Sequence, residues 1–117
     1  MIKEPIGKIK RYYSSISEGE KIIAKAYIQG AVHSFCSNNK DSELSVRILF
    51  GGENKDWANT PLQCIFDYYK CVKNSKDPYM QAAIDVGWLL KEVLYDDTRI
   101  FVYVSTDTGN RYKQVER

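Results

Sequence analysis

Metal coordination is the first chemistry that the residue types suggest, because one histidine and three cysteines fall in two predicted helices. His33 and Cys36 are spaced i, i+3, so both could reach one ion. Cys64 and Cys71 lie on one face of the other helix, but about 10 Å apart along its axis. Two sulfur ligands of one zinc ion lie within roughly 4 Å of each other, so this pair cannot share an ion. We predict no metal site, and small, buried or half-buried roles for Cys64 and Cys71.

The other chemically suggestive motifs lack the partners that catalysis needs. His33 lies midway along an apolar helix, without a Ser or Cys partner and a third orienting group. The stretch "FGGEN" at 50–54 lacks the Lys-Ser/Thr pair of a P-loop and predicts a turn. The acidic pair at 96–97 predicts a helix end. "RYYSS" at 11–15 has no nearby histidine pair of the kind that metal-dependent, strand-cleaving tyrosine enzymes use. We therefore predict no catalytic residue, no enzymatic activity and no cofactor.

Length and composition describe one globular domain. A chain of 117 residues can bury a core without metals or disulfides. The net charge of +2 is well short of the basic balance of a dedicated nucleic-acid binder, although a local patch matters more than the total. Three cysteines without a framework spacing predict a reduced, cytoplasmic protein. We expect no signal peptide and no membrane association, because no apolar run is long enough.

The clearest helix is predicted for residues 18–38. Ser17 and Glu20 form an S-x-x-E capping box at its start, and apolar residues recur at helical spacing. These residues fall on most sides of the cylinder, which predicts a central helix packed on more than one side. The segment that follows, 40–59, fits either a strand or a short helix capped by Ser42. We expect a short helix and then a loop.

Two further helices and a hairpin follow. The second helix, 61–73, begins with a proline after the N-cap Thr60. The third, 78–94, also begins with a proline, directly after an aspartate. Two strand-like runs, 99–105 and 110–115, flank a turn and predict a β-hairpin.

The third helix is apolar on almost every side, which predicts a core helix. Gly87 costs about 1 kcal/mol in a helix interior, so we expect another element to pack closely against it. The residues expected to face outward are few: Gln81, Asp85, Trp88, Lys91 and Glu92.

The order of helix, intervening segment, helix, tight turn, helix and hairpin resembles a winged helix-turn-helix domain. The resemblance runs from Ser17 to Glu116, after a basic N-terminal arm at 1–16. The segment 40–59 is inserted where the family has a short connection or strand. The expected fold is α+β and mainly helical, with a winged-helix-like core of three to four helices and a C-terminal β-hairpin. Residues 1–117 would form a single domain.

The winged-helix resemblance implies binding to double-stranded DNA. The first turns of the third helix would face the major groove, the hairpin would contact phosphate or the minor groove, and the preceding turn would contact phosphate. The residues so implied are Tyr79, Gln81, Ala82 and Asp85 in the helix, Asn110, Arg111 and Lys113 in the hairpin, and Lys73 and Lys76 in the turn. Gln81 is the one obvious base reader. The first hypothesis is therefore a small non-enzymatic regulator, such as one from a mobile element, with one positive stripe formed by the turn and the hairpin.

A protein-binding module or inhibitor, of the immunity or anti-defence type, is the second hypothesis. Aromatic residues expected at the surface, Trp57, Tyr68 and Tyr79, would act as interface anchors. The inserted segment 40–59 would be the contact loop. A homodimer formed through the N-terminal segment and the first helix is compatible with the winged-helix resemblance. An enzyme of unrecognised type is the third hypothesis, and the lack of clustered His, Asp, Glu or Cys argues against it.

Overall fold

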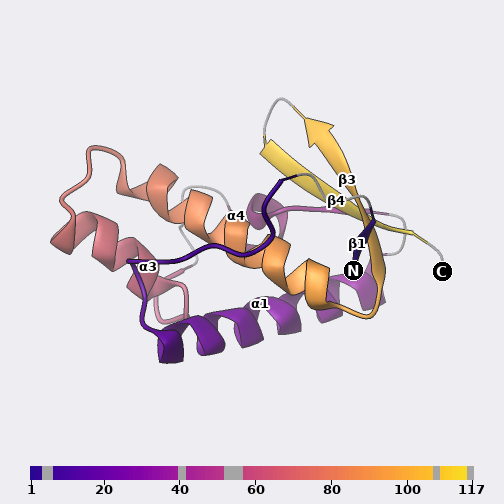
Figure 1. The fold of residues 1–117 in the computed structure, drawn as a ribbon, viewed down its shortest axis with the longest axis horizontal. Helices are drawn as coiled ribbons and strands as arrows, with labels where there is room; N and C mark the ends of the chain where they lie inside the picture. The colour runs from indigo at the N-terminus through magenta and orange to yellow at the C-terminus, as the bar shows by residue number, and fades with distance from the viewer. Residues whose placement is uncertain (4–6, 40–41, 52–56, 107–108, 116–117) are drawn as a thin grey trace.

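The computed structural model describes residues 1–3, 7–39, 42–51, 57–106 and 109–115. Within these ranges the fold is α+β, with four helices and a four-stranded sheet that includes a C-terminal hairpin. Two long helices run along the molecule, and the hairpin lies above their right-hand half (Figure 1). The predicted fold class, mainly helical α+β with a C-terminal hairpin, is confirmed. None of the helices described is long and apolar enough to cross a bilayer.

Helix α1 (Glu18–Asn38) begins at the predicted capping box. The Ser17 hydroxyl accepts a hydrogen bond from the Glu20 amide, and the Glu20 carboxylate accepts one from the Ser17 amide. A single stripe of α1 is buried, formed by Ala24, Ile28, Val32 and Cys36. Ile22 and Ile23 remain 68% and 59% exposed. The prediction that this helix packs on more than one side is therefore wrong.

The segment after α1 contains both of the structures that its sequence allowed. Strand β2 (Glu43–Leu44) leads directly into helix α2 (Val46–Phe50). The Ser45 hydroxyl caps α2, so the short helix is confirmed but its predicted cap, Ser42, is wrong. Residues 40–41 and 52–56 lie outside the described residues, and with them most of the predicted glycine turn at 50–54 and part of the predicted contact loop at 40–59.

The second helix, predicted for residues 61–73, is shorter than expected. It changes from α-helical to π-helical winding partway along. Helix α3 (Gln63–Asp67) continues into the π-helical segment η2 (Tyr68–Val72). The N-cap is Leu62, not the predicted Thr60, although the Thr60 hydroxyl accepts a hydrogen bond of 3.2 Å from the Leu62 amide. The wider turn of a π-helix shifts which side chains face a neighbour, and such turns are frequent near functional sites. Tyr69 lies in this segment and donates a hydrogen bond to Asp85 of the next helix.

Helix α4 (Pro78–Asp96) supplies the largest share of the core. The Asp77 carboxylate caps it by accepting from the Met80 amide at 3.1 Å, with the proline in the first turn as predicted. Its buried apolar side chains are Ala82, Val86, Leu89, Leu90, Val93 and Leu94. A Cβ added at Gly87 would meet Val46 at 4.0 Å, an ordinary contact. The expected close packing against Gly87 is therefore wrong.

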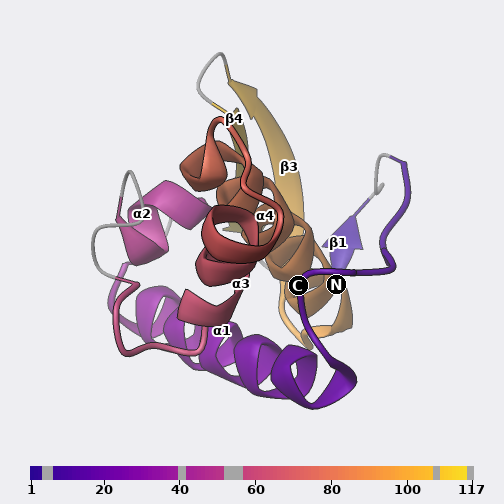
Figure 2. The same ribbon diagram turned by 90° about the vertical axis from the view of Figure 1, so that its left-hand side faces the viewer.

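The sheet has the strand order β1-β3-β4-β2. Strands β3 (Ile100–Thr106) and β4 (Gly109–Val115) form the predicted hairpin, and β2 pairs antiparallel with β4. Strand β1 (Ile2–Lys3) pairs parallel with β3. The predicted N-terminal arm thus begins in the sheet, and residues 7–17 then cross α4 to reach α1 (Figure 1). Figure 2 shows α1 at one edge of the molecule, with α4 between it and the hairpin.

Candidate functional site

Two buried carboxylates lie on α4, facing the N-terminal segment. Asp85 and Glu92 are only 2% and 0% exposed. They are two helical turns apart and therefore share one face of α4. The prediction that both residues face outward is wrong. A buried carboxylate is costly unless it is paired and hydrogen-bonded, so its partners define what this face does.

Asp85 is held by three side chains from two separate segments. Its Oδ2 accepts hydrogen bonds from the Ser15 hydroxyl at 2.8 Å and from the Tyr69 hydroxyl at 2.7 Å. Its Oδ1 lies 3.3 Å from Nη1 of Arg11, whose guanidinium also lies 5.6 Å from the ring centre of Trp88. Burial, and then the bond to Asp85, raises the pKa of Tyr69 to about 12. Asp85 thus ties both the N-terminal segment and η2 to α4.

Glu92 is held in the same way from the N-terminal segment and α1. Its Oε2 accepts a hydrogen bond of 2.9 Å from the Tyr13 hydroxyl. Its Oε1 forms ion pairs with Nζ of Lys21 at 3.2 Å and Nζ of Lys25 at 3.8 Å. Burial, followed by the hydrogen bond to Glu92, raises the pKa of Tyr13 well above its ordinary value. The negative charge of Glu92 is therefore compensated by cations from α1.

We call this group of side chains the clasp. Its members are Arg11, Tyr13, Ser15, Lys21, Lys25, Tyr69, Asp85 and Glu92. Catalytic carboxylates must reach a substrate, whereas the two in the clasp are almost fully enclosed by their own partners. The arrangement fastens the N-terminal segment across α4. The sequence contained an indication of this arrangement: Asp85 and Glu92 lie seven residues apart in a helix that is otherwise mostly apolar.

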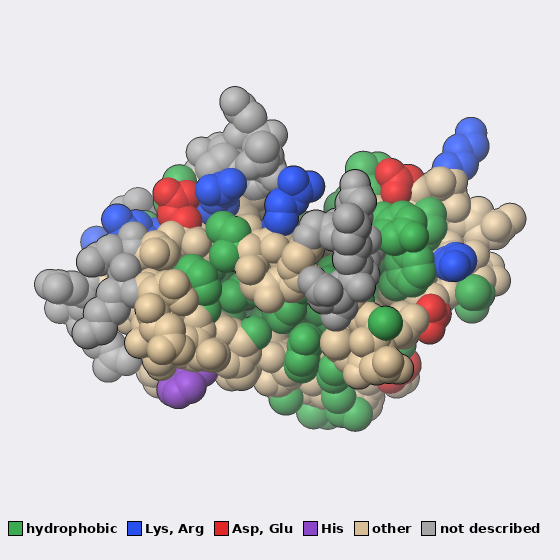
Figure 3. Space-filling model, turned by 180° about the vertical axis from the view of Figure 1, so that it is seen from behind, with side chains coloured by type: hydrophobic (Ala, Val, Ile, Leu, Met, Phe, Trp, Pro, Cys, Tyr) green, Lys and Arg blue, Asp and Glu red, His purple; other side chains and the backbone are tan. Residues whose placement is uncertain are grey.

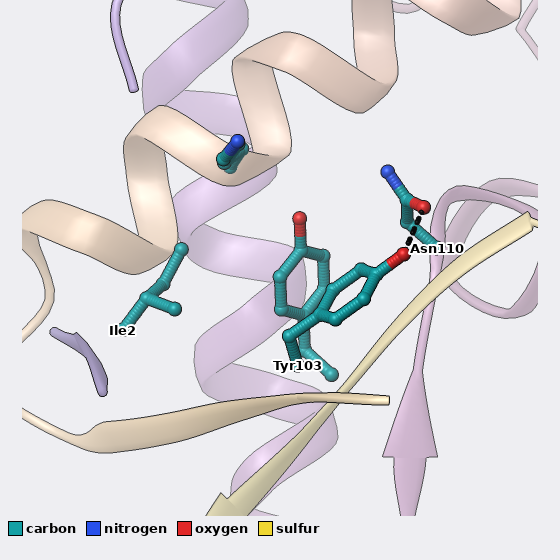
Figure 4. Close-up of a pocket in the computed structure, with 5 residues that line it drawn as sticks. Ile2, Tyr103 and Asn110 are labelled. Atoms are coloured by element: carbon teal, nitrogen blue, oxygen red, sulfur yellow. Dashed lines mark hydrogen bonds between the residues drawn. The ribbon is translucent and has the colours of Figure 1, made fainter. Parts of the chain in front are cut away.

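A small pocket lies where the sheet meets α4. Ile2, Lys91, Tyr103, Asn110 and Tyr112 line a volume of about 100 Å³. The Tyr103 hydroxyl points to Asn110 and donates a hydrogen bond of 2.9 Å to its Oδ1 (Figure 4). Burial lowers the pKa of Lys91, and burial raises the pKa of Tyr112 to about 12. Ligand pockets usually enclose about 300 Å³ or more, so this one has room for a few water molecules and not for a cofactor.

The basic residues predicted to form one stripe lie on separate parts of the molecule. Lys73 and Lys76 lie in the turn between η2 and α4, at the left end of the view, whereas Arg111 and Lys113 lie on β4 in its right-hand half (Figure 1). Nη1 of Arg111 also lies 3.8 Å from Oε1 of Glu43, which offsets part of its charge. The structure therefore contains two separate basic pairs in place of the predicted stripe.

The implied reading surface at the start of α4 is mostly turned inward. Ala82 is fully buried and Asp85 belongs to the clasp, so neither faces a groove. Tyr79 is exposed and Gln81 is half-buried. Asn110 is exposed on β4, near the hairpin turn. Two of the four helix positions implied by the resemblance are therefore wrong.

The predicted aromatic anchors do not form one surface either. Trp57 is 2% exposed, so its predicted role as an exposed anchor is wrong. Tyr68 is half-buried and meets Tyr69 edge to face, with ring centres 5.1 Å apart. Tyr79 is exposed beside Phe66, with ring centres 4.8 Å apart.

The histidine and the cysteines are scattered. His33 is exposed and contacts Arg99, while Cys36 is buried. Cys64 is half-buried as predicted, but Cys71 is exposed, which corrects its predicted role. Among the residues that the structure describes, no group of three His, Cys, Asp or Glu side chains could hold a metal ion.

An uncharged, exposed face of α1 is the surface that the sequence analysis missed. We call it the α1 outer face, and its residues are Ile22, Ile23, Ala26, Tyr27 and Gly30. Hydrophobic side chains gather along the lower edge of the molecule, where α1 runs (Figure 3). Lys21 and Lys25 turn away from this face toward Glu92. The sequence did indicate this surface. Apolar residues lie on most sides of α1, and because only one side packs against the rest of the chain, the apolar residues on the other sides are exposed.

Comparison of the chain with protein-family models, with curated proteins and with solved structures finds no match.

Proposed function

We propose that this protein is a non-enzymatic protein-binding module whose contact surface is the α1 outer face. The observation that carries the proposal is the exposure of Ile22 and Ile23, at 68% and 59%, in a group of five neighbouring residues that carry no charge. Single exposed apolar residues are ordinary, but a contiguous group on one element is typical of a contact surface.

The energetics favour covering this face. Burying an exposed isoleucine side chain contributes about 1.5–3 kcal/mol. Lys21 and Lys25 are paired with Glu92 and need not be desolvated, whereas the exposed Glu18 and Glu20 border the face and can stay in solvent at its rim. An uncharged centre with polar residues around it is the usual composition of a protein interface.

Site-specific photo-crosslinking in the cells that naturally make the protein tests the proposal. A photoreactive residue at Ile23 is expected to give covalent protein adducts. Val72 is the matched control, because it is also apolar and 73% exposed, but it lies on η2. Equal adducts from both positions, or none from Ile23, would contradict the proposal.

Nucleic-acid binding through the hairpin is a second candidate, which one observation favours. Tyr112 is buried, so its neighbours Arg111 and Lys113 share the opposite face of β4. Two cations on one face of a strand are suited to phosphate contacts, although Glu43 of β2 lies on the same face beside them.

A salt titration of binding to double-stranded DNA tests the second candidate. The Arg111→Glu/Lys113→Glu variant is expected to bind more weakly, with a log–log salt dependence reduced by about 2. The Lys73→Glu/Lys76→Glu variant has the same change in charge on a separate part of the molecule and should bind like the wild type. Equal losses in the two variants would indicate a nonspecific effect of net charge.

A further inference from the structure

The pocket between the sheet and α4 contains a buried hydroxyl group without a partner. Tyr112 is only 2% exposed and lines this pocket. Among the residues that the structure describes, none forms a hydrogen bond with its hydroxyl. The neighbouring Tyr103 hydroxyl, by contrast, donates to Asn110. A buried polar group without a hydrogen bond is unfavourable, so the Tyr112 hydroxyl points to a ligand in the pocket.

The fold gathers the lining residues from three strands and one helix. Tyr103 of β3 is paired with Tyr112 of β4, and their ring centres lie 5.9 Å apart. Asn110 precedes Tyr112 by two residues and therefore lies on the same face of the sheet. Ile2 of β1 joins this face from the other side of β3. Lys91 of α4 lines the pocket from above the sheet.

We propose that this pocket binds a short-chain monocarboxylate anion of about the size of acetate, with Lys91, Asn110 and Tyr112 as its hydrogen-bond donors. Oδ1 of Asn110 accepts from the Tyr103 hydroxyl, so the amide nitrogen of Asn110 remains as a donor. None of the described residues that line the pocket is acidic. An ionised carboxylate only accepts hydrogen bonds, so its oxygens match this set of donors.

The volume and charge of the pocket limit what it can hold. An apolar cavity of about 150 Å³ binds benzene, so a volume of about 100 Å³ holds about four heavy atoms, as in acetate. Lys91 is the charged residue among the described lining residues, and its single positive charge balances one carboxylate. Phosphate has more oxygens and would need more donors. Ile2 lies across the pocket from Asn110 and offers an apolar wall to the carbon end of the ligand (Figure 4).

The surroundings of Lys91 also favour an anion. Burial lowers the pKa of Lys91, because its charged form loses hydration there. A carboxylate at hydrogen-bond distance would stabilise the charged form and raise this pKa again. Nζ of Lys91 lies 5.1 Å from the ring centre of Trp88, which restricts where the ammonium group can lie.

Titrations of the full chain, followed by nuclear magnetic resonance, test the proposal. The ligands are sodium acetate, acetamide and inorganic phosphate, at constant ionic strength. Acetate is expected to shift the side-chain amide of Asn110 and the backbone amides of β4 saturably, with a Kd of about 0.1–10 mM. Acetamide has the same shape without the charge and should bind about ten-fold more weakly or worse. No saturation with acetate, equal binding of acetamide, or tighter binding of phosphate would each overturn the proposal.

Tyr112→Phe separates ligand binding from folding. The variant keeps the ring and removes only the hydroxyl without a partner, so its thermal midpoint without ligand should equal or exceed that of the wild type. Its affinity for acetate should fall about ten-fold or more, because a hydrogen bond to a charged group is lost. Unchanged affinity would overturn the proposal. A lower midpoint would do so too, because it would show that the hydroxyl already has a partner within the chain.

Lys91→Gln tests the charge, with Lys113→Gln as its matched control. Lys113 follows Tyr112 directly on β4 and therefore lies on the opposite face of the sheet. Lys91→Gln should weaken acetate binding about ten-fold or more, whereas Lys113→Gln should bind like the wild type. Equal losses in the two variants would mean that acetate responds only to net charge, and would overturn the site. The pocket is separate from the α1 outer face, so neither result bears on the proposed function.

Discussion

Oε2 of Glu92 accepts a hydrogen bond of 2.9 Å from the Tyr13 hydroxyl, although 79 residues separate the two in the chain. The hydroxyl of Ser15 makes the equivalent contact to Asp85, two turns earlier on α4. The N-terminal segment is therefore fastened to α4 at two points, and its stability can be tested separately at each.

Removing the Tyr13 hydroxyl should destabilise the protein. Tyr13→Phe leaves Oε2 of the buried Glu92 without its hydrogen bond, which costs about 1–3 kcal/mol in the free energy of unfolding. Urea denaturation measures this loss. Tyr12→Phe is the matched control, because Tyr12 is 87% exposed and should change stability by less than about 0.5 kcal/mol. Equal stability of the two variants would show that the Tyr13 contact contributes nothing.

Removing the Asp85 carboxylate should destabilise the protein more than removing the Tyr13 hydroxyl does. Asp85→Ala leaves two hydroxyl donors, those of Ser15 and Tyr69, without their acceptor, at about 1–3 kcal/mol each, and it also removes the ion pair of the partly exposed Arg11. Hydrogen exchange should show faster exchange in residues 7–17. The control is Asp96→Ala, at an ion pair whose side chains are partly exposed, where the loss should stay below about 1 kcal/mol. A fully protected N-terminal segment in Asp85→Ala would contradict the role given to the clasp.

Stability should fall at alkaline pH. Burial raises the pKa of Tyr69 and of Tyr112 from 10.0 to about 12. Between these values the unfolded chain releases protons that the folded chain keeps, so the free energy of unfolding decreases as pH rises. The stabilising contribution is complete below pH 10. Denaturation midpoints measured across this range should fall less steeply for Tyr69→Phe than for the wild type. An unchanged slope in that variant would contradict the prediction.

Two isoleucines of α1 should respond oppositely to truncation. Ile28 is fully buried, so Ile28→Ala should destabilise the protein by about 2–5 kcal/mol. Ile22 is 68% exposed, and Ile22→Ala should change stability by less than about 0.5 kcal/mol in dilute solution. Thermal unfolding of the two variants makes the comparison. Similar losses in both would mean that α1 is covered on both sides within one chain.

Local signals predicted the starts of the long helices. The Ser17–Glu20 capping box and the Asp77 cap are hydrogen bonds between residues three apart, so the sequence alone specifies them. All four ends of the hairpin strands were predicted to within one residue, because alternation and turn residues are also local.

Local signals could not predict which side of each long helix faces the core. Hydrophobicity alone places Ile22 inside and Asp85 outside, whereas the structure has the reverse. The partners that make Asp85 tolerable in the interior are Arg11, Ser15 and Tyr69, which all lie outside the helix that carries Asp85. Helical periodicity also assumes one uniform winding, so it missed the π-helical turn that contains Tyr69.

The parallel pairing of β1 with β3 has a consequence for the order of folding. Ile2 and Lys3 find their partners at Phe101 and Val102, almost the whole described chain away. Closing so long a loop costs entropy before any contact stabilises it, whereas α1, α4 and the hairpin depend on nearer contacts. We expect pulse-labelling hydrogen exchange to show the amides of β1 protected last. During synthesis β1 would leave the ribosome before the rest of the described chain. It would nevertheless reach its folded position after the rest.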